Sequence, residues 1–102
     1  MDKAAHLHDF TFGPQARDAS AFSALACHMF DALAQEQAGE RRSRAVSVHL
    51  DFLGNAASGA LTGRAEVTKS TASALFMAAE LKDGTETVLR ATALYGLVGR
   101  GA

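Results

Sequence analysis

The sequence predicts an α+β domain in which one helix packs against an antiparallel sheet. Three observations support this fold class. Apolar residues recur with helical spacing over residues 18–37. From residue 44 onward apolar and polar residues alternate instead, which is the period of a strand. Asp83-Gly84 is a strong hairpin signal, and no proline interrupts the alternating segments. With no repeat and no linker, residues 1–102 are expected to form a single domain.

The N-terminal part is expected to contribute a short strand before the helix. Residues 7–12 alternate, which places Phe10 and Phe12 on one face, and Gly13-Pro14 then ends the strand. The helix over 18–37 has two candidate N-caps, Asp18 and Ser20, and Ala38-Gly39 is a C-terminal stop signal. Its apolar stripe consists of Phe22, Leu25, Ala26, Met29 and Leu33, with Phe30 at the edge.

Four strands are predicted after the helix, over residues 44–53, 59–69, 72–82 and 85–98. The first of them carries an apolar stripe that is expected to cover the helix, made of Val46, Val48, Leu50 and Phe52.

The other face of strand 44–53 carries His49 and Asp51, which point to the same side because they are two residues apart. Two such side chains make a weak metal site, so we expect a solvated strand face and no bound metal. Strand 72–82 is apolar on both faces. A small one-layer sheet cannot cover both faces by itself, so the chain is expected to be at least a homodimer.

Composition excludes several classes of function. The chain has 10 basic and 11 acidic residues, a formal net charge of −1, which argues against a nucleic-acid-binding protein. No apolar run approaches the ~20 residues that span a bilayer, and the first ten residues lack the apolar core of a signal peptide. The single cysteine, Cys27, has no internal disulfide partner, which fits a reducing compartment. A cytoplasmic location is therefore expected, with no membrane partner.

The segments VSVHLDFLGNAASGALTGRAEV and SALFMAAELKDGTETVLRATALYGLV follow an alanine-rich helix. In this order they resemble the hotdog-fold thioesterases over roughly residues 10–98. In that family Phe52-Leu53 would end a strand, the small residues 55–58 would form a turn, and Gly59 would precede the next strand. The resemblance implies a helix wrapped by a curved antiparallel sheet, and a homodimer or homotetramer that binds an acyl-CoA or other acyl thioester at the interface.

The resemblance also suggests candidate site residues, although the family's usual motifs are degenerate here. Thioesterases of this family use a carboxylate near or within the helix, and Asp18 is the carboxylate at the helix start. It is the candidate catalytic residue, and a plain N-cap is its alternative role. The backbone amides of Ala19 and Ser20 would hold the thioester oxygen. The candidate acyl-pocket residues, which are also candidate core residues, are Phe22, Met29 and Phe76. No cofactor is implied.

Two departures from the family pattern leave the chemistry open. Neither Gly-His nor His-Gly-Gly precedes the helix, and Ala24-Leu25-Ala26 is followed by Cys27 where one branch of the family has an aspartate. We expect Cys27 to be a buried, inert thiol, and Asp31 to be solvated or at an interface. The leading hypothesis is an acyl-CoA thioesterase that uses a carboxylate-activated water. The alternatives are a catalytically silent hotdog protein that binds an acyl chain or acyl-CoA or serves as an assembly module, and an unrelated α+β interaction domain.

Overall fold

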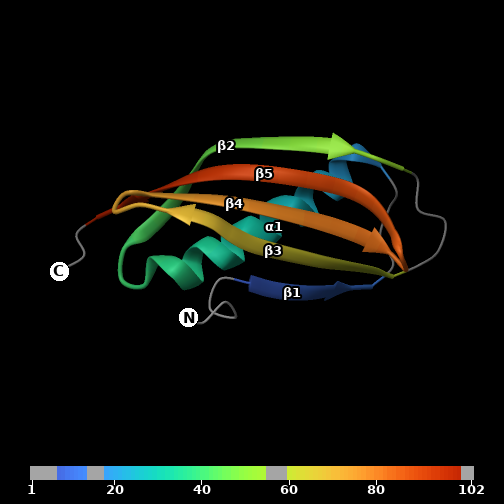
Figure 1. Cartoon of the computed structure of the whole chain (residues 1–102), viewed down its shortest axis with the longest axis horizontal. Helices are drawn as coiled ribbons and strands as arrows, with labels where there is room; N and C mark the ends of the chain where they lie inside the picture. Colours follow the sequence, from blue (N-terminus) through green and yellow to red (C-terminus); the bar gives the residue numbers. More distant parts are fainter. Residues whose placement is uncertain (1–6, 14–17, 55–59, 100–102) are drawn as a thin grey trace.

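In the computed structural model, which describes residues 7–13, 18–54 and 60–99, one helix lies across one face of a five-stranded antiparallel sheet (Figure 1). The elements follow one another as β1 (Leu7–Phe12), α1 (Ala19–Ala38), β2 (Arg42–Phe52), β3 (Leu61–Ser70), β4 (Ala74–Asp83) and β5 (Glu86–Val98). The strands are ordered β1-β3-β4-β5-β2, so β1 and β2 form the two edges. The predicted α+β class and all six elements are confirmed, and the arrangement is that of the hotdog fold.

The helix begins and ends where capping chemistry places its termini. Asp18 has extended backbone angles and caps the first turn, and the chain leaves the helix at Gly39, whose φ of 64° suits a residue without a Cβ. The predicted stripe faces the sheet, with Phe22, Ala26, Met29 and Leu33 buried. Phe30 is fully buried rather than at the edge of the stripe.

The core lies between α1 and the inner face of the sheet. Alternate residues of the central strands point into it, as the period of two requires. In strand order these inner side chains are Leu61 and Ala65 from β3, Leu75, Met77, Ala79 and Leu81 from β4, and Leu89, Ala91, Ala93, Tyr95 and Leu97 from β5. Tyr95 brings a hydroxyl group into this core, and no other polar or charged residue is buried in the described part of the chain.

The predicted stripe of β2 is only partly correct. Val48 and Leu50 pack against the core, but Val46 is 58% exposed and Phe52 is 49% exposed. The cause at Val46 is a bulge, because the register with β5 steps from Ala45 to Ser47 and leaves Val46 without an opposite residue. A similar bulge in β5 leaves Val88 without an opposite residue on β4. Val88 is fully buried although the alternation places it on the outer face.

Several features that the sequence suggested lie outside the described residues, among them Pro14, the turn at 55–58 and Gly59. The hairpin at Asp83-Gly84 is confirmed, with Gly84 at a φ of 64° between β4 and β5. Within the described part of the chain, the structure contains no helix that is both long and apolar enough to cross a membrane.

Candidate functional site

Asp18 stands at the N-terminus of α1 with its side chain exposed. One of its carboxylate oxygens, Oδ1, accepts a hydrogen bond from the backbone N–H of Ala21 at 2.8 Å, and its own carbonyl accepts from the N–H of Phe22 at 3.0 Å. Asp18 is therefore an N-cap, as one of its two predicted roles requires. The second carboxylate oxygen is not used by this bond.

The first turn of α1 offers backbone amides beside this carboxylate. Amides of a first turn have no partner within the helix, and the helix dipole favours negative charge there. Ala19 and Ser20 lie in this turn and are exposed. The amide of Ala21 is already engaged by Asp18. An anionic oxygen could thus accept hydrogen bonds from the amides of Ala19 and Ser20. For the amide of Ala21 it would compete with the side chain of Asp18.

The candidate acyl-pocket residues are not brought together. Phe22 and Met29 are buried in the core between α1 and the sheet. Phe76 points to the opposite face of the sheet, where it is 37% exposed and lies beneath the Nζ of Lys69, 5.8 Å from the ring centre. Within one chain, Phe76 and the other two therefore cannot line the same pocket.

A second carboxylate stands in the middle of α1. The hydroxyl of Tyr95, from the inner face of β5, donates a hydrogen bond to Oδ1 of Asp31. Burial of the Tyr95 side chain, followed by this hydrogen bond to Asp31, raises the pKa of the Tyr95 hydroxyl. The contact fixes one oxygen of an otherwise exposed carboxylate on the outer surface of the helix.

The sequence alone did not pair Tyr95 with Asp31, but a signal was present. Tyr95 is the only polar side chain on the inner stripe of β5, and a buried tyrosine hydroxyl usually finds a hydrogen-bond partner. The neighbouring prediction about Cys27 is wrong, since this thiol is exposed. Cys27 lies one helical turn before Asp31, on the same outward face of α1, which is the reason for its exposure.

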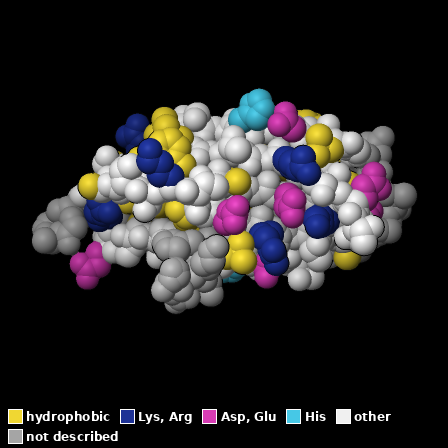
Figure 2. Space-filling view, in the orientation of Figure 1, with side chains coloured by type: hydrophobic (Ala, Val, Ile, Leu, Met, Phe, Trp, Pro, Cys, Tyr) yellow, Lys and Arg dark blue, Asp and Glu magenta, His cyan; other side chains and the backbone are white. Residues whose placement is uncertain are grey.

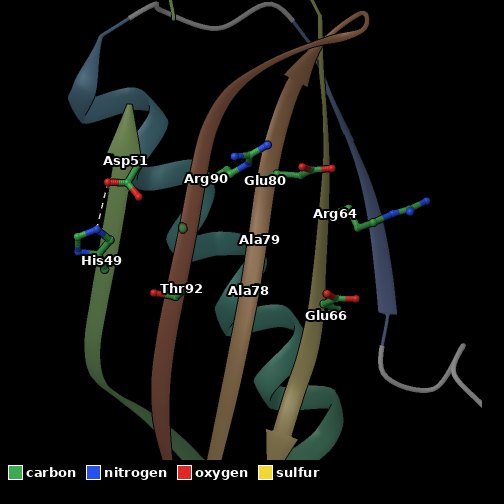
Figure 3. A pocket seen from close by; sticks show the side chains of 10 residues that line it. His49, Asp51, Arg64, Glu66, Ala78, Ala79, Glu80, Arg90 and Thr92 are labelled. Carbon is green, nitrogen blue, oxygen red and sulfur yellow. Dashed lines mark hydrogen bonds and ion pairs between the residues drawn. The ribbon is translucent and has the colours of Figure 1, made fainter. Parts of the chain in front are cut away.

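His49 and Asp51 lie on the outer face of β2, as predicted, and their side chains are joined at 3.1 Å between Nε2 and Oδ1 (Figure 3). Both side chains are well exposed. Across the described residues, no three His, Cys, Asp or Glu side chains gather closely enough to hold a metal ion.

A hollow lies on the outer face of the sheet, and His49 and Asp51 are among the residues that line it (Figure 3). It has a volume of about 470 Å³, and small side chains from β4 and β5, Ala78 and Thr92, lie on its floor. Charged side chains of β2 to β5 surround them. None of the predicted catalytic or acyl-pocket residues lines this hollow.

The chain also matches known proteins. A family model described as the acyl-CoA thioesterase N-terminal domain matches residues 18–96, which run from the cap of α1 into β5. No curated protein matches the chain in sequence.

Solved structures share its fold at low sequence identity. A thioesterase from Staphylococcus aureus, solved as a mutant, is 12% identical with a TM-score of 0.83, and the match covers 92% of this chain and 87% of that one. The PaaI protein of the E. coli phenylacetic acid degradation operon is 18% identical with a TM-score of 0.81, over 91% of this chain and 73% of the other. A phenylacetic acid degradation-related protein from Ralstonia eutropha is 19% identical with a TM-score of 0.73, and the match covers 94% of this chain and 80% of that one. At these sequence identities, the similarity to the solved structures shows a shared fold.

Proposed function

Since the chain belongs to the family of acyl-CoA thioesterase N-terminal domains, we propose that it hydrolyses an acyl thioester with a carboxylate-activated water. The observation that carries this proposal is the family match over residues 18–96, which includes the helix N-terminus, the strands β2 to β4 and most of β5. An acyl-CoA is the proposed substrate, because coenzyme A thioesters give the family its name. The single free cysteine is compatible with the proposed cytoplasmic location.

Asp18 is the proposed general base. Its Oδ2 is not used in the capping bond and can accept a proton from a water that attacks the carbonyl carbon of the thioester. The carbonyl oxygen becomes an oxyanion, held by the amides of Ala19 and Ser20 at the positive end of the helix. When the carbon–sulfur bond breaks, the departing thiolate takes the proton back from Asp18. The products are a carboxylic acid and a free thiol.

The acyl group needs an apolar space beside α1. Phe22 and Met29 are already packed in the core. The edge strand β2, in contrast, leaves Val46, Phe52 and Leu53 exposed. A long edge strand with free backbone groups and apolar side chains is a template for pairing with another strand. We therefore propose a homodimer through β2, whose interface supplies the acyl site next to α1.

The experiment is an assay of the wild-type protein on short, long and aromatic acyl-CoAs, with two matched variants. Asp18→Asn keeps a side-chain oxygen for capping but cannot act as a base. It should lower the rate by about 10²–10⁴-fold. Asp31→Asn replaces the exposed carboxylate in the middle of α1 and should keep most of the activity. Circular dichroism and thermal unfolding establish that both variants are folded.

Each result has a distinct meaning. Full turnover by folded Asp18→Asn removes Asp18 from the mechanism, and loss of activity in Asp31→Asn alone assigns the base to Asp31. A wild-type protein that hydrolyses none of the acyl-CoAs but binds them in equilibrium dialysis supports the alternative function, a silent acyl-binding hotdog protein. A protein that neither hydrolyses nor binds them contradicts the proposed substrate class.

A further inference from the structure

One end of the sheet carries basic residues and no acidic ones. The register of the strands brings residues 42–48, 67–77 and 91–98 together at this end. These segments contain no aspartate or glutamate, although acidic residues outnumber basic ones in the whole chain. Figure 2 shows the outer face of the sheet, and towards its upper left hydrophobic side chains lie between Lys and Arg side chains. The charge of the molecule is therefore unevenly distributed, with a positive end.

The middle of this end is apolar and accessible on the outer face. Phe76 of β4 and Leu94 of β5 are opposite one another in the register, and both line a hollow of about 420 Å³. Val46, which the bulge turns outward, extends this apolar floor over Gly96, since its Cγ2 lies 3.7 Å from the place of a Cβ on Gly96. Val46 is 58% exposed and Phe76 is 37% exposed. Exposed apolar side chains that are rimmed by polar ones mark interaction sites.

Basic side chains stand on both sides of this floor. On the β3 side, Lys69 is opposite Phe76 in the register, and its Nζ lies 5.8 Å from the centre of the ring. On the β2 side, Arg44 is opposite Gly96, and Arg42 follows on the same face because it is two residues away. All three basic side chains are exposed, and none forms an ion pair with a residue that the structure describes. We call the floor and its two flanks the basic groove.

The dimensions of the basic groove indicate the shape of its occupant. The flanks are on β3 and β2, which are three strand spacings apart, or about 14 Å. An α-helix with its side chains is about 10–12 Å in diameter, so it can rest on the floor and reach both flanks. An extended peptide is only about 4.8 Å wide and would reach one flank. It could not add to the sheet here either, because β4 and β5 are paired on both sides.

We propose that the basic groove binds an acidic amphipathic helix of a partner protein. The apolar stripe of this helix rests on Phe76, Leu94 and Val46, and acidic side chains on its two sides meet Lys69 and Arg44. The apolar residues provide the affinity, whereas the charges at the rim fix the orientation and accelerate association.

The length of the groove defines the sequence pattern that the partner needs. From Leu94 to Val98 the floor extends over about 14 Å, which corresponds to about nine residues of helix. An apolar stripe over this length has residues at i, i+4 and i+7. Aspartate or glutamate should stand on both sides of the stripe, because basic residues flank the groove on both sides.

A flat anionic membrane fits the groove less well than a helix. Phe76 and Leu94 lie in a hollow, which a convex surface can enter but a flat one cannot. The groove is also on the face of the sheet opposite α1 (Figure 1), and Asp18 is at the N-terminus of that helix. The inference therefore does not depend on the proposed activity.

The test measures binding of a labelled synthetic peptide to the full chain by fluorescence anisotropy. The peptide has about 18 residues, long enough to form helix on its own, with leucine at i, i+4 and i+7 and glutamate on both sides of the leucines. A second peptide carries lysine in place of every glutamate. The glutamate peptide should bind and gain helical circular dichroism, whereas the lysine peptide should not bind.

Three variants should weaken binding of the glutamate peptide. Arg44→Glu and Lys69→Glu should each raise its Kd by about tenfold or more, because each places like charges together at the interface. Phe76→Ser, which removes apolar contact area on an exposed face, should raise the Kd by about tenfold as well. Arg90→Glu is the matched control, since it makes the same change of charge on the same face but outside the groove, and it should leave the Kd unchanged. Circular dichroism verifies that each variant is folded.

Several results would overturn the proposal. These are no binding of the glutamate peptide, equal binding of the lysine peptide, or a control that weakens binding as much as Arg44→Glu does. Vesicles of phosphatidylserine and phosphatidylcholine form the second arm of the test. If the wild type binds the vesicles and not the peptide, the groove recognises lipid and the proposal is wrong. It is equally wrong if the wild type ignores the peptide and Phe76→Ser lowers the mass in sedimentation equilibrium, because another copy of the chain then covers the groove.

Discussion

The hydroxyl of Tyr95 donates to the carboxylate of Asp31 and so connects the inner face of β5 with the outward face of α1. The phenol ring is packed in the core beside Phe30, with the ring centres 6.4 Å apart, whereas its hydroxyl reaches the edge of the helix. This is the usual solution for a buried tyrosine, whose ring is apolar and whose hydroxyl needs a partner. The contact adds a polar link between α1 and β5 to the apolar packing of the core.

Replacement of Tyr95 by phenylalanine should therefore lower stability without opening a cavity. The lost hydrogen bond corresponds to about 0.5–1.5 kcal/mol of unfolding free energy. The measurement is urea unfolding at neutral pH, and the slope of the transition should not change. Asp31→Asn, which keeps an acceptor oxygen, serves as the control and should cost less than Tyr95→Phe. Equal stability of wild type and Tyr95→Phe would mean that the hydrogen bond contributes nothing.

The same contact predicts a dependence on alkaline pH. The raised pKa of Tyr95 means that folding favours the neutral hydroxyl over the phenolate. Its contribution to stability is therefore complete below the unfolded pKa of about 10 and is lost as the pH rises beyond it. Because Tyr95 is the only tyrosine, phenolate absorbance reports on it alone. Its titration should lie above pH 10 in the folded protein and return to the ordinary value in denaturant. Coincident titrations in the two states would contradict the raised pKa.

Much of this fold follows from local patterns, whereas the remainder depends on contacts between distant segments. The cap at Asp18, the turn at Gly84 and the alternation of β3 to β5 are local, and they place every element within a few residues. The strand order depends on non-local contacts. The bulge that turns Val46 outward does so too, because the apolar residues on both sides of Val46 keep the pattern of a regular strand and do not indicate a shift of register. The charged residues Arg64, Glu80 and Arg90 lie side by side on the outer face, and this too becomes visible only when the register of the strands is known.

The candidate site was less predictable from sequence than the fold. The acyl-pocket residues rest on the family resemblance alone, whereas alternation along β4 places Phe76 on the face opposite to Met77. Asp18 could be located because capping is local chemistry. The hydrogen-bond partner of Tyr95 could not be located from the sequence, because α1 and β5 are far apart in the chain.

Exposure of Cys27 leads to a simple chemical prediction. The thiol lies on the outward face of α1, so a disulfide reagent such as dithionitrobenzoate should modify it in the folded protein, with one thiol per chain. The total measured in denaturant provides the reference. Modification that requires denaturant would show that the outward face of α1 is covered in solution.

The capping role of Asp18 can be separated from its proposed catalytic role through stability. Asp18→Ala removes the oxygen that accepts from the amide of Ala21 and should cost about 1 kcal/mol. Asp18→Asn retains an acceptor and should remain close to wild type in thermal unfolding. If both variants are as stable as wild type, the cap does not contribute to the stability of α1.

Gly63 should be the least replaceable glycine of the sheet, because α1 passes very close to β3 at this point. A Cβ at Gly63 would overlap the Sδ of Met29 and would lie 3.2 Å from Cδ2 of Leu81 and 3.3 Å from Cε2 of Phe12. Both Met29 and Leu81 are fully buried, so neither can move aside without disturbing the core. Gly63→Ala should therefore destabilise the protein by about 1–3 kcal/mol, the usual range for overpacking.

The matched control for this prediction is Gly96→Ala, also in the interior of a strand. A Cβ at Gly96 would have its nearest contact at 3.7 Å, from Cγ2 of Val46, which is an ordinary van der Waals distance. Its backbone is not in a conformation that only glycine favours, so alanine should be tolerated there or slightly stabilising. Urea unfolding of the two variants compares them directly. A Gly63→Ala protein as stable as Gly96→Ala would mean that Met29 has room to move, and that the helix does not lie as close to β3 as the structure places it.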